Sequence, residues 1–286
     1  MRRLSSAAVG DRLDQLARSL GLPVRPWRAG TDFWADRAET ADGPAVVRSP
    51  RIDRVETSYD GVVDFGAVIE KEVTALGLMA AAGIPVPRVL GWRRGDPSWV
   101  LRSYIEHAEG AAVPLRRLGA LTRDVHDIRP SVPGLRPFES WTCFIQDRLG
   151  QRLEAARRYC DLPGSLERPV TALLASREEH TTSLLHMDLR PANVCVADGG
   201  IAALMDVANC IVGDPLMELG RIRGYGLLTD EFLAGYGSPE LSPALLDLYE
   251  LDTALLLTVV SVEEFDDPDL HRDQATRATE LAARIA

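Results

Sequence analysis

The spacing of apolar residues divides the chain into two parts of different character. In the first part, helical spacing predicts an amphipathic helix over 4–20 and a second helix over 64–82. Short runs rich in β-branched and aromatic residues predict strands, with Asp-Gly at 42–43 as a hairpin signal. These runs are LPVRPW, TDFWADRA and PAVVRS within 22–50, and SWVLRSYI at 98–105. The polar segment 51–62 is predicted to be a loop.

Helical spacing dominates the second part of the chain. Helices are predicted over 114–128, 138–160, 166–180, 214–224, 229–236, 242–262 and 270–285. The stretch 184–206 interrupts them and predicts short strands around a loop. We therefore expect an α+β fold of two lobes. The first, residues 1–104, is small and β-rich with one main helix; the second, residues 105–286, is larger and mostly helical.

Composition narrows the class of protein. The chain has 286 residues and a net charge of −10, which argues against nucleic acid as a partner. Four cysteines lack metal-ligand spacing, so free thiols in a reducing cytoplasm are expected. The longest apolar run, 254–262, is far shorter than the roughly 20 residues that span a bilayer. We expect no membrane and no obligate protein partner.

The acidic excess is concentrated near the C-terminus. From Leu227 to Ala286 there are thirteen acidic residues against three arginines, which equals the whole net charge. Such a surface is either simply solvated or attracts a cationic substrate. The candidates for binding a polyamine-like substrate are Glu231, Glu263, Glu264 and Asp266. A solvated helix end before Pro268 is the alternative for the last three.

The segment 184–219 carries the candidate chemistry. It contains His186-x-Asp188-x4-Asn193, then Asp206 at the end of a second apolar run. This is the spacing of a phosphoryl-transfer loop followed by a metal-binding aspartate. Asp188 is suited to accept the proton of an acceptor hydroxyl, and the side-chain oxygens of Asn193 and Asp206 are suited to Mg²⁺. His186 is expected to brace the loop by hydrogen bonds.

These residues resemble the aminoglycoside phosphotransferase family, the antibiotic kinases that share the protein-kinase-like fold. The family loop H-G-D-L-x-x-x-N reads HMDLRPAN at 186–193, and its metal segment is matched by Met205-Asp206 and by GDPLMEL at 213–219. EVTAL at 72–76 and GIPVPRVL at 83–90 look like the family's helix and the link after it. The resemblance spans roughly residues 25–220.

The resemblance implies a role for each matching residue. Asp188 would be the catalytic base, Asn193 and Asp206 would hold Mg²⁺, and ATP or GTP would be the co-substrate. The loop from Gly30 to Trp34 would cover the phosphates, and the hinge from Arg102 to Ile105 would contact the purine. The implied nucleotide-binding residues are Gly30, Thr31, Arg48, Glu72, Ser103 and Ile105.

The chain departs from the family pattern at three positions. Arg48 stands where the family often has lysine; it keeps the charge and can fork onto phosphate oxygens, although a structural arginine at a strand edge is the alternative. Met187 replaces a glycine and is expected to crowd the loop, and Glu218 replaces an aspartate. Glu70 competes with Glu72 as the partner of Arg48, but the two point some 200° apart on a helix. The family register favours Glu72.

The sequence supports three hypotheses of function. The first is a Mg²⁺-dependent kinase that transfers the γ-phosphoryl group of ATP or GTP to a hydroxyl of an antibiotic, aminoglycoside-like or otherwise hydroxylated, giving resistance. The second is a metabolic kinase for a sugar, a choline-like alcohol or a homoserine-like acceptor. The third is a pseudokinase-like binding module, favoured only by Arg48 and Met187.

Overall fold

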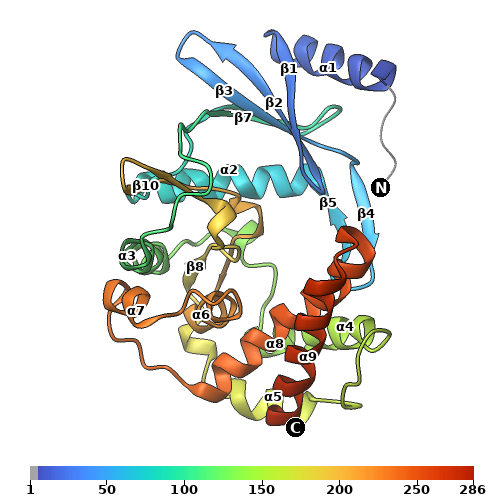
Figure 1. Ribbon diagram of the computed structural model, residues 1–286, viewed down its shortest axis with the longest axis vertical. Helices are drawn as coiled ribbons and strands as arrows, with labels where there is room; N and C mark the ends of the chain where they lie inside the picture. Colours follow the sequence, from blue (N-terminus) through green and yellow to red (C-terminus); the bar gives the residue numbers. More distant parts are fainter. Residues whose placement is uncertain (1–5) are drawn as a thin grey trace.

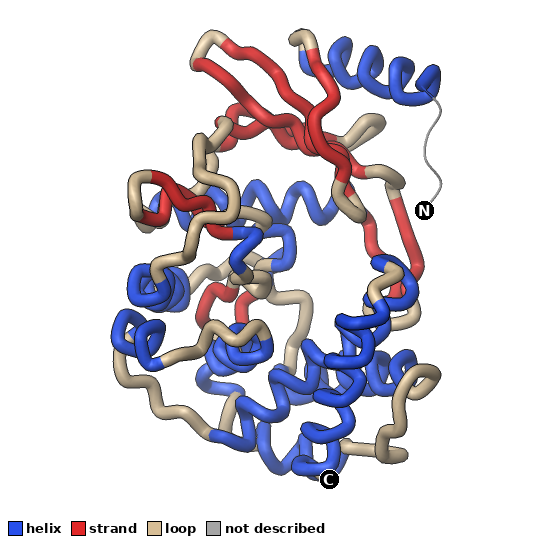
Figure 2. The backbone as a smooth tube through the Cα atoms, in the orientation of Figure 1, coloured by secondary structure: helices blue, strands red, loops and turns tan. Residues whose placement is uncertain are grey.

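The computed structural model describes residues 6–286 and confirms the α+β fold (Figure 1). Strands gather at one end of the molecule and helices fill the other (Figure 2). The expected first helix is α1 (Ser6–Leu20), so the predicted positions 4 and 5 lie outside the described residues. None of the described helices is long and apolar enough to cross a membrane.

A five-stranded antiparallel sheet forms the smaller lobe. Its strand order is β1 (Val24–Ala29), β2 (Phe33–Thr40), β3 (Gly43–Pro50), β7 (Trp99–Ser103) and β6 (Val89–Arg93). Helix α1 packs on one face through Leu16, which contacts Ala45 and Val47 of β3 in one apolar cluster. The other face packs against α2 (Phe65–Ala81). Because side chains alternate along a strand, Arg48 lies on the α2 face.

The segment predicted as a loop is a hairpin, so that prediction was wrong. Strand β4 (Arg54–Thr57) pairs with β5 (Gly61–Asp64), with Val55 opposite Val63. Gly61 has a φ of +68°, which glycine adopts without strain and which lets the chain reverse. The hairpin pairs with no other strand of the described chain and exposes half of Val62, so it lacks the apolar alternation that marks a half-buried strand.

The larger lobe is built around one helix that is buried on most sides. Helix α8 (Pro243–Val260) packs against α4, α6 and α9, and its side chains are apolar nearly all round. The other helices are α3 (Leu115–His126), α4 (Trp141–Ala156), α5 (Glu167–Leu174), α6 (Pro215–Gly224), α7 (Asp230–Tyr236) and α9 (Pro268–Ile285). One π-helical turn, η5 (Ser261–Phe265), follows α8.

Two short strand pairs contain the segment 184–206, which carries the candidate catalytic residues. Strand β8 (Ser183–Leu185) pairs with β11 (Ile211–Gly213), and β9 (Val194–Ala197) pairs with β10 (Gly200–Leu204). These pairs confirm the prediction of short strands around a loop. Short 3₁₀ turns fill the connections at η1 (Pro133–Leu135), η2 (Glu178–His180), η3 (Pro191–Asn193) and η4 (Val207–Asn209). All four cysteines are free, and Cys195 and Cys210 are buried.

Helices α3 and α7 touch through their backbones. A Cβ atom added to Gly119 would overlap the carbonyl oxygen of Phe232, and one added to Gly235 would overlap that of Arg116. Only glycine permits this approach, and α7 lies directly against α3 as a result (Figure 1).

The β4–β5 turn ties the two lobes together. The Tyr59 hydroxyl donates to Glu264 of η5, and Asp60 accepts from Arg152 of α4 at 2.7 Å. Figure 1 shows this hairpin reaching down beside the C-terminal helices. The turn thus supplies polar contacts across the lobe boundary.

Candidate active site

Arg48 and Glu72 form a buried ion pair between the sheet and α2. The Arg48 Nη1 atom lies 2.7 Å from Glu72 Oε2, and Arg102 donates to the other carboxylate oxygen at 2.6 Å. Strand β3 lies inside the sheet, so Arg48 is not at a sheet edge. Glu70 points elsewhere and pairs with the exposed Arg94 at 2.9 Å. The structure therefore gives Arg48 the partner that the sequence register favoured.

Asp206 lies on the other side of the Arg48 guanidinium. Arg48 Nη2 is 3.2 Å from Asp206 Oδ1, and the aspartate side chain is 39% exposed. The charge of Arg48 holds the pKa of Asp206 below its ordinary value, although burial acts in the opposite direction. Burial lowers the pKa of Arg48, but the charges of Glu72 and Asp206 outweigh it and raise that pKa. Both groups are charged at neutral pH.

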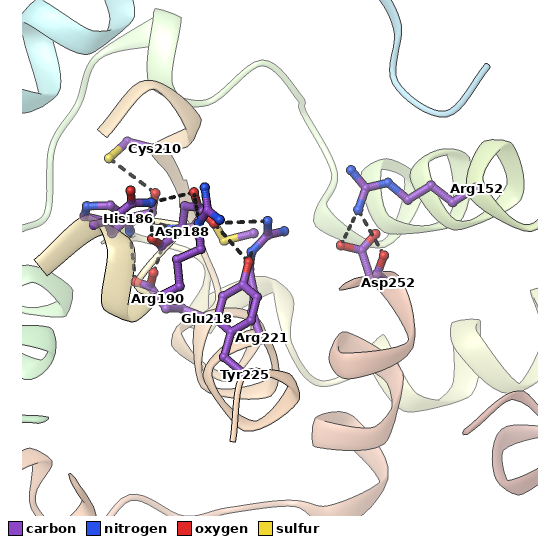
Figure 3. Close-up of polar contacts among 11 residues, drawn as sticks. Arg152, His186, Asp188, Arg190, Cys210, Glu218, Arg221, Tyr225 and Asp252 are labelled. Atoms are coloured by element: carbon purple, nitrogen blue, oxygen red, sulfur yellow. Dashed lines mark hydrogen bonds and ion pairs between the residues drawn. The ribbon is translucent and has the colours of Figure 1, made fainter. Parts of the chain in front are cut away.

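Asp188 is held by groups from two elements (Figure 3). The amide nitrogen of Asn193 donates to Asp188 Oδ2 at 2.7 Å, and the Tyr225 hydroxyl donates to Oδ1 at 2.9 Å. Arg221 of α6 places Nη2 at 3.6 Å from the same Oδ1 and donates from Nε to the Tyr225 hydroxyl at 3.0 Å. The half-exposed Arg190 donates to Oδ2 at 3.3 Å. The carboxylate is thus fixed in one orientation.

The Glu218 side chain, on α6, binds the backbone of the candidate catalytic loop at His186 and Met187. Its buried carboxylate accepts from the backbone N–H of His186 at 2.9 Å and of Met187 at 2.6 Å. His126 Nε2 lies 2.9 Å from the same carboxylate, and His126 Nδ1 is 2.8 Å from the Tyr236 hydroxyl. Burial raises the pKa of Glu218, but the hydrogen bond and charge of His126 and the charge of His186 bring it below the ordinary value.

The predicted brace by His186 is present in a limited form. Its Nδ1 atom accepts from the Asp188 backbone N–H at 3.3 Å. Its Nε2 atom is buried and has no hydrogen-bond partner among residues 6–286. Glu218 makes shorter hydrogen bonds to the loop than His186 does. It therefore stabilises the loop, a role that was not predicted from the sequence. A charged residue within the apolar run Leu216-Met217-Glu218-Leu219 was the available signal.

The candidate phosphate loop lies between β1 and β2. Gly30 donates its N–H to Phe33 O at 2.8 Å, and its carbonyl accepts from Arg51 at 2.9 Å. Thr31 follows it, partly exposed. Asp32, which the sequence analysis did not single out, has its pKa raised by burial and by the charge of Asp206. The turn therefore lies close to the Asp206 side of the site.

The candidate hinge follows β7. Ser103 exchanges two hydrogen bonds with the Arg88 backbone, each 2.9 Å: it donates its N–H and accepts on its hydroxyl. The Ile105 carbonyl lies 2.9 Å from His107 Nδ1. Ser103 is thus tied to the link before β6, and the segment leads directly into the larger lobe.

The four acidic candidates for a cationic substrate do not form one site. Glu231 is exposed on α7, which packs against α3. Glu263 pairs with Arg158 and accepts from the Tyr159 hydroxyl at 2.9 Å, while Glu264 accepts from Tyr59. Asp266 is exposed in a left-handed turn with a φ of 52°. Two of these carboxylates are engaged in internal contacts, and the set is divided between two regions.

Asn193 and Asp206 offer a donor set that suits Mg²⁺. The Asn193 amide nitrogen is used on Asp188, so its amide oxygen is the atom left for a cation. Asp206 supplies a partly exposed carboxylate. The Met205 N–H donates to Asn193 O at 2.8 Å, which holds the two segments together. Hard oxygen donors of this kind are the usual ligands of Mg²⁺.

Comparisons with known proteins show the family and the fold of the chain. The model of a phosphotransferase enzyme family matches residues 23–250. A macrolide 2′-phosphotransferase from Brachybacterium faecium is 21% identical, with a TM-score of 0.59, and the match covers 94% of this chain and 97% of that one. A putative fructosamine-3-kinase from Haemophilus somnus is 17% identical, with a TM-score of 0.69 and 96% of each chain covered.

A third solved structure is a thermostable mutant of an aminoglycoside phosphotransferase in ternary complex with ADP and hygromycin B. It is 16% identical, with a TM-score of 0.67, and the match covers 95% of this chain and 97% of that one. At these identities the likeness establishes the fold. No match was found among curated proteins.

Proposed function

The chain belongs to the phosphotransferase enzyme family, and we propose that it transfers the γ-phosphoryl group of ATP or GTP to a hydroxyl of a small molecule. A hydroxylated antibiotic is the leading acceptor class, because macrolide and aminoglycoside phosphotransferases share the fold over nearly their whole length. Phosphorylating the antibiotic would give resistance.

The observation that carries the proposal is the line of charged groups from Glu72 through Arg48 to Asp206. Arg48 lies 2.7 Å from Glu72 and 3.2 Å from Asp206. A cation held between a helix carboxylate and a metal-binding carboxylate is the arrangement that kinases need for phosphate binding. Asp188 and Asn193 are joined at 2.7 Å beside it.

Each residue has a distinct role in the proposed reaction. Arg48 binds phosphate oxygens of the nucleotide, since its forked guanidinium matches their geometry. Asp188 orients the acceptor hydroxyl toward the γ-phosphorus and takes its proton as the new O–P bond forms. The bond from the γ-phosphorus to the bridging oxygen of the β-phosphate breaks in the same displacement, and the nucleoside diphosphate leaves. Asn193 and Tyr225 hold the Asp188 carboxylate in place. Positioning and charge supply most of the catalysis in this reaction class.

Asn193 and Asp206 would hold Mg²⁺, which would neutralise charge on the phosphate oxygens when bound. Gly30 and Thr31 would cover the phosphates, and the segment from Ser103 to Ile105 would contact the purine. In this proposal residues 1–104 bind the nucleotide, and residues 105–286 supply the base and the acceptor site.

The test is NDP release from ATP and from GTP, with and without Mg²⁺, across hydroxylated antibiotics and metabolites. Asp188→Ala should lower acceptor-stimulated release by about 10²–10⁴-fold, because it removes the general base. Nucleotide binding should stay unchanged. The matched control is Asp269→Ala, an aspartate 82% exposed on α9. Normal turnover by Asp188→Ala would overturn the assignment of the base.

A metabolic acceptor is the second candidate. The putative fructosamine-3-kinase from Haemophilus somnus has a TM-score of 0.69 against this chain, above that of the macrolide enzyme. Sugar derivatives therefore belong in the same acceptor screen. Release stimulated by a sugar derivative and by none of the antibiotics would favour this candidate.

A further inference from the structure

Three cations that lack a full set of acidic partners interact with one another from α2, α4 and α6, and the one on α6 reaches Asp188. They are Lys71, Arg148 and Arg221, and they are distinct from Arg48, which pairs with Glu72 and Asp206. A role for these three cations in acceptor binding rests on the proposed function, because it takes Asp188 as the base that meets the acceptor.

Arg221 is the cation nearest the base. Its Nε atom donates to the Tyr225 hydroxyl at 3.0 Å, and its Nη2 atom is 3.6 Å from Asp188 Oδ1, beyond hydrogen-bond distance. Its two terminal nitrogens have no hydrogen-bond acceptor among residues 6–286. In Figure 3 the guanidinium lies on the side of Asp188 that faces Arg152 and Asp252. The side chain is 8% exposed, so these N–H groups are largely shielded from solvent.

Arg148, on α4, is the second cation of the group. Its Nε atom donates to Asp252 Oδ1 at 2.9 Å, while Nη1 is 3.9 Å from Asp60. The fully buried Arg152 is the nearer partner of Asp60, at 2.7 Å, and it binds the second oxygen of Asp252 at 2.9 Å. The terminal fork of Arg148 therefore has no close hydrogen-bond acceptor within the described chain. Burial and the charges of Arg152 and Arg221 lower the pKa of Arg148.

Lys71 is the only lysine of the chain. It lies on α2 directly before Glu72 and is partly buried, and its side-chain amine makes no hydrogen bond or ion pair to any residue from 6 to 286. Burial lowers its pKa, and the charge of Arg148 acts in the same direction. A cation without a carboxylate partner in a partly buried position is costly unless a ligand supplies the opposite charge.

The local charge balance argues against a polycationic acceptor. Four cations lie near two carboxylates here: the cations are Lys71, Arg148, Arg152 and Arg221, and the carboxylates are Asp60 and Asp252. The carboxylate of Asp188 is not counted, because in the proposed reaction it accepts the hydroxyl proton. Among the acidic residues that could attract a polyamine, Glu263 and Glu264 are already bonded to tyrosine hydroxyls. We propose that Lys71, Arg148 and Arg221 bind an anionic group, a carboxylate or phosphate, on the acceptor whose hydroxyl Asp188 receives.

The same cations could instead bind the γ-phosphoryl group during its transfer, because that group is also an anion. The two sources differ in consequence. An anion on the acceptor makes the site select among acceptors, whereas contact with the γ-phosphoryl group affects every acceptor equally.

The single lysine gives a direct test of occupancy. A neutral amine-acylating reagent would modify only Lys71 and the α-amino group, and mass spectrometry would follow each rate with Mg²⁺-ADP at saturation. D-glucuronate and inorganic phosphate should slow acylation of Lys71 by roughly threefold or more, since a bound anion covers the amine. D-glucuronamide, which lacks the charge, should not. The α-amino group is the internal reference.

Variants show whether the predicted residues make the site. Arg221→Gln and Arg148→Gln should abolish the protection by glucuronate, and Arg221→Lys should restore part of it because the charge remains. The control Arg94→Gln removes a half-exposed arginine that follows β6 and pairs with Glu70, and it should leave the protection intact. Equal acylation rates with every anion in the wild type would overturn the proposal.

Kinetics separate the two sources of the anion. With acids and their matched amides as acceptors, Arg148→Gln should raise KM for the acids roughly tenfold and leave KM for the amides unchanged, because Arg148 does not contact Asp188. An equal fall in kcat for both would place the cations on the transferred phosphoryl group and overturn the acceptor site. If anions protect Lys71 but no acceptor stimulates NDP release, the anion site stands and the proposed kinase function is rejected. If neutral or cationic acceptors stimulate NDP release but no anion protects Lys71, the kinase function stands and the anion site is rejected.

Discussion

Met187 holds a backbone conformation that glycine usually fills. Its φ of 67° lies in the left-handed region, which costs a non-glycine residue about 1–2 kcal/mol. Its side chain is 3% exposed within the main apolar cluster, and full burial of a methionine contributes about 1.5–3 kcal/mol. Packing therefore outweighs the strain, which explains how the loop tolerates the departure from the family glycine.

Two substitutions separate these opposing effects. Met187→Ala keeps the strain and loses the packing, so it should destabilise the protein by about 2–5 kcal/mol. Met187→Gly relieves the strain and should be about 1 kcal/mol more stable than Met187→Ala, yet less stable than the wild type. Urea unfolding measures all three. A glycine variant more stable than the wild type would show that strain dominates.

Glu218 should make stability depend on pH in a specific direction. Its pKa is lowered by folding, so its contribution is present above the ordinary value of 4.5 and is lost as the pH falls through the folded value. Glu218→Gln should cost about 1–3 kcal/mol near pH 7, because buried amide donors lose a charged acceptor. The gap between wild type and variant should narrow below pH 4.5 in urea unfolding.

The control for that experiment is Glu231→Gln, since Glu231 is exposed on α7. It should change stability by less than about 0.5 kcal/mol at either pH. A Glu218→Gln penalty that grows on acidification would contradict the direction of the pKa shift.

For single residues, the sequence predicted the ion-pair partner of Arg48 but not the residues that hold the candidate catalytic loop. The choice of Glu72 over Glu70 depends only on helix geometry, so it could be made in advance. Tyr225 and Glu218 hold the catalytic loop from residues 31 or more positions away along the chain. Their role depends on where α6 packs, which no local pattern of residues reveals.

Among the elements, the crossing of α3 and α7 depends on two glycines. Gly119→Ala and Gly235→Ala would each place a methyl group on the backbone of the other helix, so the helices must separate. Overpacking of this kind costs about 1–3 kcal/mol or more. Thermal unfolding should show each variant to be less stable than the wild type.

The matched control is Gly150→Ala on α4, where an added Cβ meets no atom within 4 Å. Alanine is the better helix former, so this variant should gain about 0.5–1 kcal/mol. If Gly119→Ala were stabilised to the same extent, the close approach of the helices would be wrong.

Most helices and sheet strands could be predicted because their apolar residues repeat with a fixed period. The β4–β5 hairpin could not, since each of its strands has only four residues and its turn is held by contacts of Tyr59 and Asp60 with the other lobe. A pattern search needs a longer run of alternating residues, so it misses strands this short.

In the whole molecule, the β4–β5 turn should make the two lobes unfold together. Asp60 bonds the fully buried Arg152, and Tyr59 bonds Glu264. We expect tryptophan fluorescence, which reports mainly the smaller lobe, and far-UV circular dichroism to give one thermal midpoint. Asp60→Ala removes one of these ties, so fluorescence should then change at a lower temperature than circular dichroism. Two separate steps in the wild type would contradict this coupling.

The net charge of the whole chain does not describe the charge beside Asp188. The acidic excess of residues 227–286 left open a solvated surface or a cationic acceptor, because charge summed over sequence says little about the field at one point. At the base, the cations come from α2, α4 and α6, which are far apart along the chain. Only the fold brings them together.

Helix α6 also bears on how acceptor preference could change during evolution. One short helix and the residue after it supply Glu218 to the loop backbone, and Arg221 and Tyr225 to the side of the base. A substitution at Arg221 that adapts the enzyme to a new acceptor would therefore disturb Asp188 in the same step. Lys71 and Arg148 lie on other helices and do not touch Asp188, so new specificities are more easily reached through them.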